Sequence, residues 1–198
     1  MQYKIKQQKQ IKHFFMDEFG KEKGRLLFDK EFTTLSFIIE QITEKTKNQI
    51  KTLIQTILPR IAMYKTFLNE KFSKDQAKKY TRKYMLEIIA SKKHDSTAKM
   101  EKLPGFYYIY SSVFLKIMRT TDLQVSTQNH GRDFYDVTIT KCLWHTACVE
   151  NGCEELCSLF CDVDDVTYGG LKKIGFSRNQ TIGYGGSCCD FHFFRKSG

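Results

Sequence analysis

The chain has 198 residues, of which 41% are hydrophobic and 14% aromatic, so it can build a sizeable core in one or two domains. Two prolines and 12 glycines exclude a low-complexity or fibrous chain. No apolar run reaches the roughly 18 residues of a membrane span, and the polar start does not resemble a secretory signal. We therefore expect a soluble, cytoplasmic protein with no membrane partner.

The net charge of +10 is divided unevenly along the chain. Residues 1–100 contain 22 basic and 11 acidic side chains, whereas residues 101–198 contain 10 basic and 11 acidic ones. The basic residues of the first part alternate with acidic ones on helical patterns, and no zinc-finger or RNA-recognition signature occurs. We interpret these lysines as the solvated face of helices, which argues against nucleic acid as a partner.

The first 100 residues are predicted to be helical. Apolar residues at three- and four-residue spacing indicate helices over 5–20, about 25–58 and 60–92. The run 33–36 is the expected place for a break, and Pro59 is expected to end one helix or start the next. Ser73, three residues before Gln76, predicts a helix N-cap.

A polar stretch over 91–105 predicts a loop and a boundary. A helix over 106–118 is expected to follow it. Two strands, over 122–129 and 133–140, then alternate polar and apolar residues around a tight turn at Asn129-His130-Gly131.

The last third of the chain predicts two short helices, over 141–150 and 153–163, followed by strands over 171–182 and 187–194. Alternation in the last strand places Cys189 on one face and Cys188, Asp190 and His192 on the other. We predict an α+β fold in which an N-terminal helical layer packs with a small, mainly antiparallel sheet. Residues 1–100 would form a helical region and 101–198 a Cys-rich region of one composite domain.

All the cysteines lie in the second half of the chain: Cys142, Cys148, Cys153, Cys157, Cys161, Cys188 and Cys189. Their odd number and the expected location argue against a disulfide framework. Cys153, Cys157 and Cys161 recur every four residues, which predicts that they stack on one helix face. No C-x2-C pair typical of structural zinc occurs, so we assign no metal and no cofactor.

Four short motifs occur in order between Asp136 and Phe193. They are a strand ending in Cys142, Phe-Cys161-Asp-Val-Asp164, Phe-Ser-Arg178-Asn-Gln-Thr181-Ile and Cys189-Asp190-Phe. This order resembles the L-2-amino-thiazoline-4-carboxylic acid hydrolase family, whose pattern is a strand ending in Cys, Cys-x-x-Asp, Phe-x-Arg-x-x-Thr-Leu and Cys-Asp-Phe. The chain departs from it where Ile182 replaces Leu and where Leu143-Trp144 follow the first Cys.

The resemblance implies a small-molecule substrate and hydrolytic opening of a 2-amino-thiazoline ring to a carbamoyl-cysteine. Attack on the amidine-like ring carbon needs a nucleophile, for which Cys161 is the first candidate and Cys189 and Cys142 the next. Asp164 or Asp190 could hold the amidine nitrogens or act as general base. The remaining four cysteines are interpreted as core filler.

Arg178 offers a bidentate fork for the substrate carboxylate. Thr181, His145 and His192 are further substrate-binding candidates, and the two imidazoles could also carry protons. Several alternatives stay open: attack by an Asp-activated water, a structural ion pair between Arg178 and Asp190, and a non-catalytic sensor domain that binds a small molecule or a metal in a Cys-lined pocket. The oligomeric state is not predicted.

Overall fold

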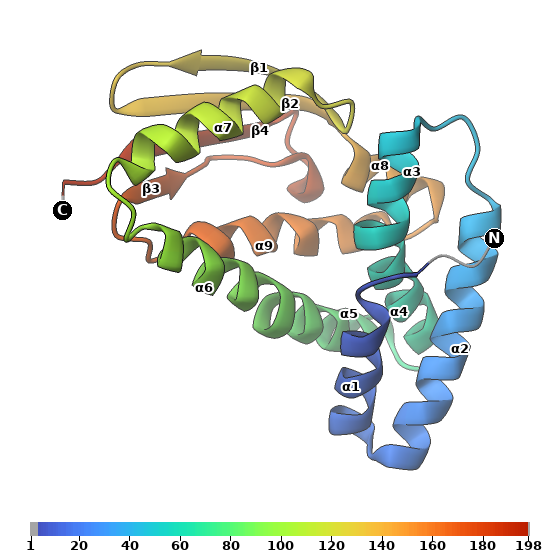
Figure 1. Cartoon of the computed structure of the whole chain (residues 1–198). Helices are drawn as coiled ribbons and strands as arrows, with labels where there is room; N and C mark the ends of the chain where they lie inside the picture. Colours follow the sequence, from blue (N-terminus) through green and yellow to red (C-terminus); the bar gives the residue numbers. More distant parts are fainter. Residues whose placement is uncertain (1–3, 198) are drawn as a thin grey trace. The chain divides into compact units, whose positions relative to one another are not determined.

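A computed structural model describes residues 4–197 (Figure 1). Contacts between residues divide the chain into two compact units. One unit runs up to Tyr84 and includes Ala147–Leu156. The other comprises Met85–Thr146 and the chain from Cys157 onward. Each unit therefore combines segments that are separated in the sequence. The division into regions 1–100 and 101–198 of one composite domain stays a prediction.

The first unit is built from helices, as predicted. They are α1 (Gln8–Phe19), α2 (Lys21–Glu40), α3 (Lys47–Thr52), a π-helical segment (Leu53–Ile57), α4 (Leu58–Asn69) and α5 (Lys74–Lys83). Pro59 lies in the first turn of α4, which continues the π-helical segment, and the carbonyl of Gln55, four residues earlier, accepts from Gln7 Nε2 at 2.6 Å in place of the missing N–H. The predicted N-cap of α5 is confirmed, because Ser73 and Gln76 form a reciprocal capping box.

The predicted break at 33–36 is wrong, because these residues lie inside α2. The Thr33 hydroxyl donates to the carbonyl of Asp29 at 3.0 Å, and Ser36 donates to that of Phe32 at 2.9 Å, so both are satisfied within the helix. The chain breaks instead at 41–46, where a capping box of Thr46 and Gln49 starts α3.

The second unit has the predicted α+β architecture. Its helices are α6 (Ser91–Met100), α7 (Phe106–Thr120) and α9 (Cys157–Tyr168), and α8 (Leu143–Glu150) leads back to the first unit. A further π-helical segment, Tyr84–Ala90, precedes α6. Four strands form one antiparallel sheet in the order β1-β2-β4-β3: β1 (Gln124–His130), β2 (Phe134–Cys142), β3 (Ile174–Ser177) and β4 (Cys189–Arg195).

Three local predictions for this unit are wrong. Residues 91–100 form α6 rather than a loop, because Thr97 and Ala98 turn one side of this polar segment toward the core. β3 ends at Ser177, because the next backbone amides bond to Asp190 instead of to a strand. Cys153 is not on a helix with Cys157, since α9 begins at Cys157 and Gly152, with a φ of 63°, ends the preceding turn.

The helices of this unit cover one face of the sheet (Figure 1). Alternate residues of β2 and β4 point into this core, which also holds residues of α7: Tyr135, Val137, Ile139, Cys189, Phe193, Phe106 and Leu115. The opposite face carries Asp136 and His192, which are paired across β2 and β4. The sheet therefore presents Cys189 to the helices and His192 to the other side.

Candidate active site

Helix α9 supplies the candidate side chains Cys161 and Asp164. Cys157, Cys161 and Asp164 are four and three residues apart, so they share one face of the helix. Phe160 and Val163 of the same helix are buried, so α9 is held by the packing of its apolar side chains. The Cys-x-x-Asp motif is thus a helical motif.

The turn between β3 and β4 folds against α9. The backbone N–H of Ile182 donates to Cys189 Sγ at 3.4 Å. A Cβ built on Gly183 would lie 2.7 Å from Cys161 Sγ and 3.0 Å from the carbonyl of Cys157. Only a residue without a side chain can bring the backbone this close to the thiol.

The predicted cysteines gather at this contact. A hydrogen bond with the Cys157 thiol and burial raise the pKa of Cys161 well above its usual value, and the Thr181 hydroxyl partly offsets this. Burial likewise raises the pKa of Cys189, and it raises that of Cys142 to about 11 although the backbone N–H groups of His145 and Trp144 oppose it. These thiols are therefore protonated at neutral pH.

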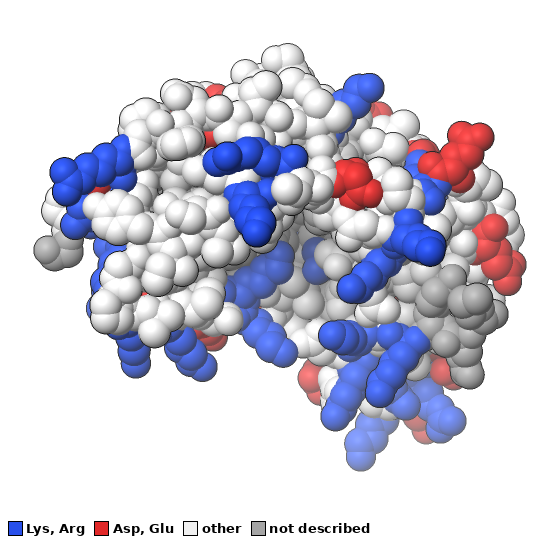
Figure 2. Space-filling model, turned by 45° about the horizontal axis from the view of Figure 1, so that its top comes forward, with Lys and Arg blue, Asp and Glu red and all other residues white. Residues whose placement is uncertain are grey.

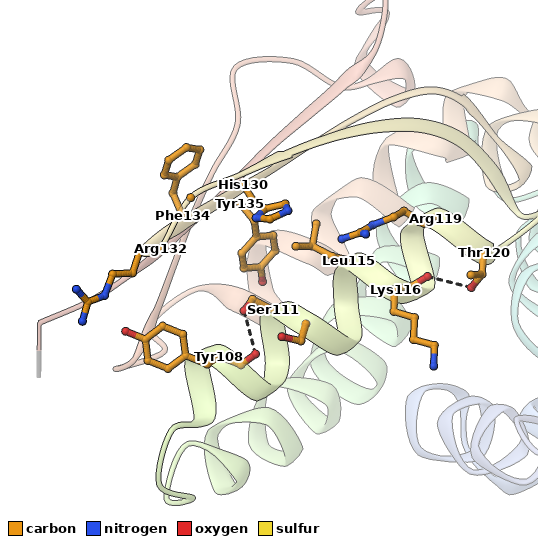
Figure 3. A pocket seen from close by; sticks show the side chains of 12 residues that line it. Tyr108, Ser111, Leu115, Lys116, Arg119, Thr120, His130, Arg132, Phe134 and Tyr135 are labelled. Atoms are coloured by element: carbon orange, nitrogen blue, oxygen red, sulfur yellow. Dashed lines mark hydrogen bonds between the residues drawn. The ribbon is translucent and has the colours of Figure 1, made fainter.

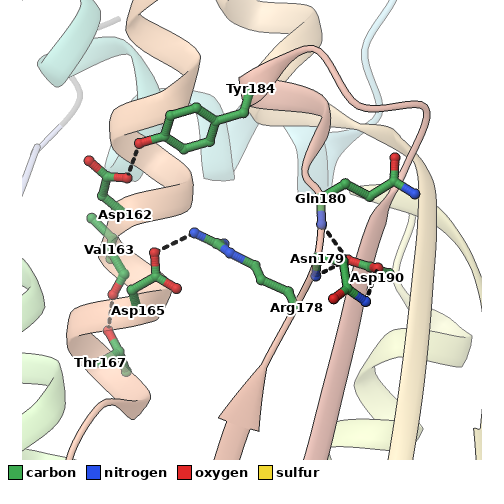
Figure 4. Close-up of polar contacts among 9 residues, drawn as sticks. All are labelled: Asp162, Val163, Asp165, Thr167, Arg178, Asn179, Gln180, Tyr184 and Asp190. Carbon is green, nitrogen blue, oxygen red and sulfur yellow. Dashed lines mark hydrogen bonds and ion pairs between the residues drawn. The ribbon is translucent and has the colours of Figure 1, made fainter.

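Arg178 reaches from the end of β3 to α9 (Figure 4). Its Nη2 donates to Asp165 Oδ2 at 2.5 Å, so the considered ion pair with Asp190 is wrong. The Arg178 side chain is only 10% exposed, and its Nη1 is buried with no hydrogen-bond partner among residues 4–197. Asp165 thus holds Nη2 of the guanidinium group, and Nη1 can donate to an acceptor.

Asp164 is a carboxylate with a perturbed acidity. Burial raises its pKa to about 6, although the positive charges of Lys93 and Arg178 oppose the shift. The hydroxyls of Tyr110 and Tyr168 are hydrogen-bonded to each other at 3.2 Å. Burial is the main cause that raises the pKa values of both tyrosines, and the negative charge of Asp164 adds to it. Asp164 can therefore take up or release a proton near neutral pH.

Asp190 anchors the turn that carries the site (Figure 4). Its Oδ1 accepts the backbone N–H groups of Asn179 at 2.9 Å and Gln180 at 2.8 Å, and its Oδ2 accepts Asn179 Nδ2 at 3.1 Å. Burial alone would raise the pKa of Asp190, but these hydrogen bonds outweigh it and lower the pKa. The carboxylate thus fixes the segment between Arg178 and Thr181.

The two candidate histidines differ in their surroundings. His192 lies on the far face of the sheet, where its Nδ1 is 2.6 Å from Asp136 Oδ1, so the structure does not bring it to the thiols. His145 lies in the first turn of α8, where its backbone N–H bonds to Cys142.

Within residues 4–197, no group of three or more His, Cys, Asp or Glu side chains is arranged to hold a metal ion. No helix in the same stretch combines the length and apolar character needed to cross a membrane. On the face drawn in Figure 2, Lys and Arg side chains form several separate groups rather than one continuous band.

Comparison with known families identifies the chain. The family model for L-2-amino-thiazoline-4-carboxylic acid hydrolase matches residues 47–193. The chain belongs to this family. The match includes every candidate site residue, and it confirms the resemblance drawn from the four motifs. No curated protein and no solved structure was found to match the chain.

Several residues of the candidate site are not indicated by the sequence. Cys157 is interpreted from the sequence as core filler, but its thiol is hydrogen-bonded with that of Cys161, in line with the predicted stacking of these two cysteines on one helix face. Asp165 accepts a hydrogen bond from Arg178. The positive charge of Lys93 lowers the pKa of Asp164 and so partly opposes the effect of burial. Lys93 could not be found because its helix was predicted as a loop.

Proposed function

We propose that the protein hydrolyses a small cyclic amidine that carries a carboxylate, of the 2-amino-thiazoline-4-carboxylate type. The observation that carries this proposal is the unpartnered Nη1 of Arg178, which is buried at the end of a guanidinium fixed by Asp165. A carboxylate is the planar acceptor that complements an arginine fork. The family name supplies the substrate class.

Asp164 complements the other end of such a substrate. An ionised carboxylate beside the amidine can hold its N–H groups, and its pKa of about 6 suits a general base at neutral pH. Arg178 and Lys93 favour the ionised form of Asp164. The substrate would therefore lie between a guanidinium that binds its carboxylate and a carboxylate that faces its amidine.

The raised thiol pKa values favour water over cysteine as the attacking group. The hydrogen bond with Cys157 and burial keep Cys161 protonated, so little thiolate is available for attack, whereas Asp164 can act as general base on a water molecule while the C–O bond forms. We therefore assign the attack to a water molecule that Asp164 deprotonates. Direct attack by Cys161 is the alternative, and the thiols otherwise form the wall of the site.

The reaction balances with these groups alone. The water oxygen bonds to the ring carbon between nitrogen and sulfur while Asp164 takes its proton. The tetrahedral carbon then collapses to a carbonyl while its hydroxyl proton passes to the ring nitrogen, and one of its two ring bonds, C–S or C–N, breaks. The leaving sulfur or nitrogen takes the proton back from Asp164, which restores the site and leaves a carbamoyl product.

Turnover of L-2-amino-thiazoline-4-carboxylate by the wild-type protein and Arg178→Gln tests the proposal. Loss of a charged hydrogen bond to the substrate is expected to raise KM about 10- to 100-fold. Arg25→Lys, at an exposed position of α2, is the matched control and should leave KM unchanged. Saturable binding without turnover would make the protein a non-catalytic binding module, and an unchanged KM in Arg178→Gln would contradict the role of Arg178.

A further inference from the structure

A second site lies away from the thiols, between α7 and the β1–β2 hairpin (Figure 3). The cavity has a volume of about 640 Å³, within the range of small-molecule sites. One face of α7, from Tyr108 to Thr120, forms one wall, and the hairpin from His130 to Tyr135 forms the other. None of its lining residues belongs to the candidate active site.

The lining is strongly basic. Lys116 and Arg119 of α7 and Arg132 of the hairpin border the cavity, together with His130, and no Asp or Glu does. In the part of the chain that the structure describes, none of these three cations forms an ion pair. Three uncompensated positive charges around one cavity repel each other, so an anion bound there would stabilise them.

The cavity also contains a buried polar group without a partner. The hydroxyl of Tyr135, a residue only 1% exposed, has no hydrogen-bond partner among the described residues. Its ring is fixed by stacking on Phe193 at a centroid distance of 4.7 Å. Burial raises the pKa of Tyr135, so the hydroxyl keeps its proton and can donate it in a hydrogen bond. A buried donor held in one place without an acceptor points to a ligand.

The remaining lining groups define the chemistry further. The hydroxyls of Ser111, Ser112 and Thr120 add hydrogen-bonding groups to the basic wall. The ring of Tyr108 borders the same cavity and offers a flat surface to the organic part of a ligand, whereas the ring of Phe134 points to the other face of the sheet, beside His192. A single carboxylate would neutralise only one of the three cations, whereas a phosphate or diphosphate carries several charges and acceptor oxygens.

We propose that this cavity binds a small phosphorylated molecule, whose phosphate groups contact Lys116, Arg119 and Arg132. The inference stands on the cavity, its charge and the buried Tyr135 hydroxyl, and it does not rest on the proposed hydrolase activity. Arg119 and Arg132 would supply forked donors to phosphate oxygens, and Lys116 a flexible point charge.

Calorimetric titration of the full chain with inorganic pyrophosphate, ADP and adenosine tests the proposal. Pyrophosphate and ADP are expected to bind with saturation and more weakly at higher salt, and adenosine at least about tenfold more weakly than ADP. The double variant Lys116→Gln/Arg119→Gln should lose at least about tenfold in affinity for ADP. The matched control, Lys92→Gln/Lys102→Gln, removes two exposed lysines of the same unit and should bind as the wild type does.

Arg132→Gln, in the exposed hairpin turn, gives a second test if the double variant does not fold. Arg178→Gln should retain full ADP affinity, so that the failure of this proposal can be distinguished from the failure of the proposed hydrolase activity. Absence of saturable binding of both pyrophosphate and ADP, or an equal loss in the control variant, would overturn the proposal. Binding of a single-stranded RNA oligonucleotide but of neither small anion would overturn it as well.

Discussion

Gly183 lies against the thiol of Cys161. A Cβ at position 183 would come within 2.7 Å of Cys161 Sγ, closer than side-chain carbons approach sulfur. The neighbouring atoms of Cys157 that it would meet belong to the backbone of α9 and cannot rotate away. The turn from Thr181 to Gly186 and the thiol cluster are therefore positioned by each other.

Gly183→Ala should consequently push the turn away from α9. We expect a loss of roughly 1–3 kcal/mol in the free energy of unfolding, as for overpacking of a tight contact. Urea unfolding followed by circular dichroism measures it. Gly185→Ala is the informative comparison, because Gly185 has a φ of 84° but no neighbour within 4 Å, so its strain is in the backbone alone. If Gly183→Ala has the same free energy of unfolding as the wild type, the contact with Cys161 does not hold the turn in place.

Asp190 is expected to act as a positioning residue. Asp190→Ala removes the acceptor of two backbone N–H groups, which frees the segment that carries Arg178. The KM for the aminothiazoline carboxylate should rise about tenfold, since each lost hydrogen bond contributes roughly 1 kcal/mol, while kcat changes less. Asp190→Asn, which keeps one acceptor oxygen, should partly restore KM. A fall in kcat alone would instead indicate direct participation of Asp190 in the reaction.

The Cys161 thiol is expected to react slowly with alkylating agents. Because its pKa is raised, the thiolate fraction at pH 7.5 is below that of a free thiol, and each pKa unit lowers that fraction about tenfold. Iodoacetamide labelling followed by peptide mass spectrometry should give a rate at least about tenfold below that of glutathione. The same peptide in urea should react at the ordinary rate. Labelling of the folded protein as fast as glutathione would favour Cys161 as the attacking group.

Glu31 should make the stability of the first unit depend on pH. Burial raises the pKa of this α2 carboxyl group to about 8, although a hydrogen bond from Gln8 opposes the shift. The folded protein therefore binds a proton that the unfolded chain releases above pH of about 4.5, so stability falls by up to about 1.4 kcal/mol per pH unit until pH of about 8.

Glu31→Gln removes this titration. The variant should gain stability relative to the wild type between pH 5 and pH 8, and the gain should be larger at the higher pH. Thermal unfolding at both pH values measures it, with Glu40→Gln, at an exposed position of the same helix, as control. An equal difference at the two pH values would show that Glu31 is ionised throughout.

The sequence predicts most of the helices and the hairpin, because these depend on local patterns, and it supplies most of the candidate site residues. Periodicity located α1 and α7, and alternation placed Cys189 on the buried face of β4. The ordered motifs singled out Cys161, Asp164 and Arg178.

Features that depend on tertiary contacts could not be read from the sequence. The polar segment of α6 is helical because it packs against α9, where His94 contacts the carbonyl of Thr167 at 3.1 Å. The pairing of Arg178 with Asp165 rather than Asp190 depends on where α9 lies relative to β3. The basic cavity has no signature in the sequence, because Lys116 and Arg132 come from different elements and follow no motif.

The pH dependence of aminothiazoline carboxylate hydrolysis, in the wild type and in Asp164→Asn, tests the central claim most directly. Asp164 must be ionised to act as base, so kcat/KM of the wild type should rise with pH and reach half of its plateau near pH 6. Asp164→Asn should lose at least about 100-fold in kcat, whereas Cys161→Ala should retain activity within about tenfold. Full activity of Asp164→Asn, or its loss in Cys161→Ala with an intact fold, would contradict the account.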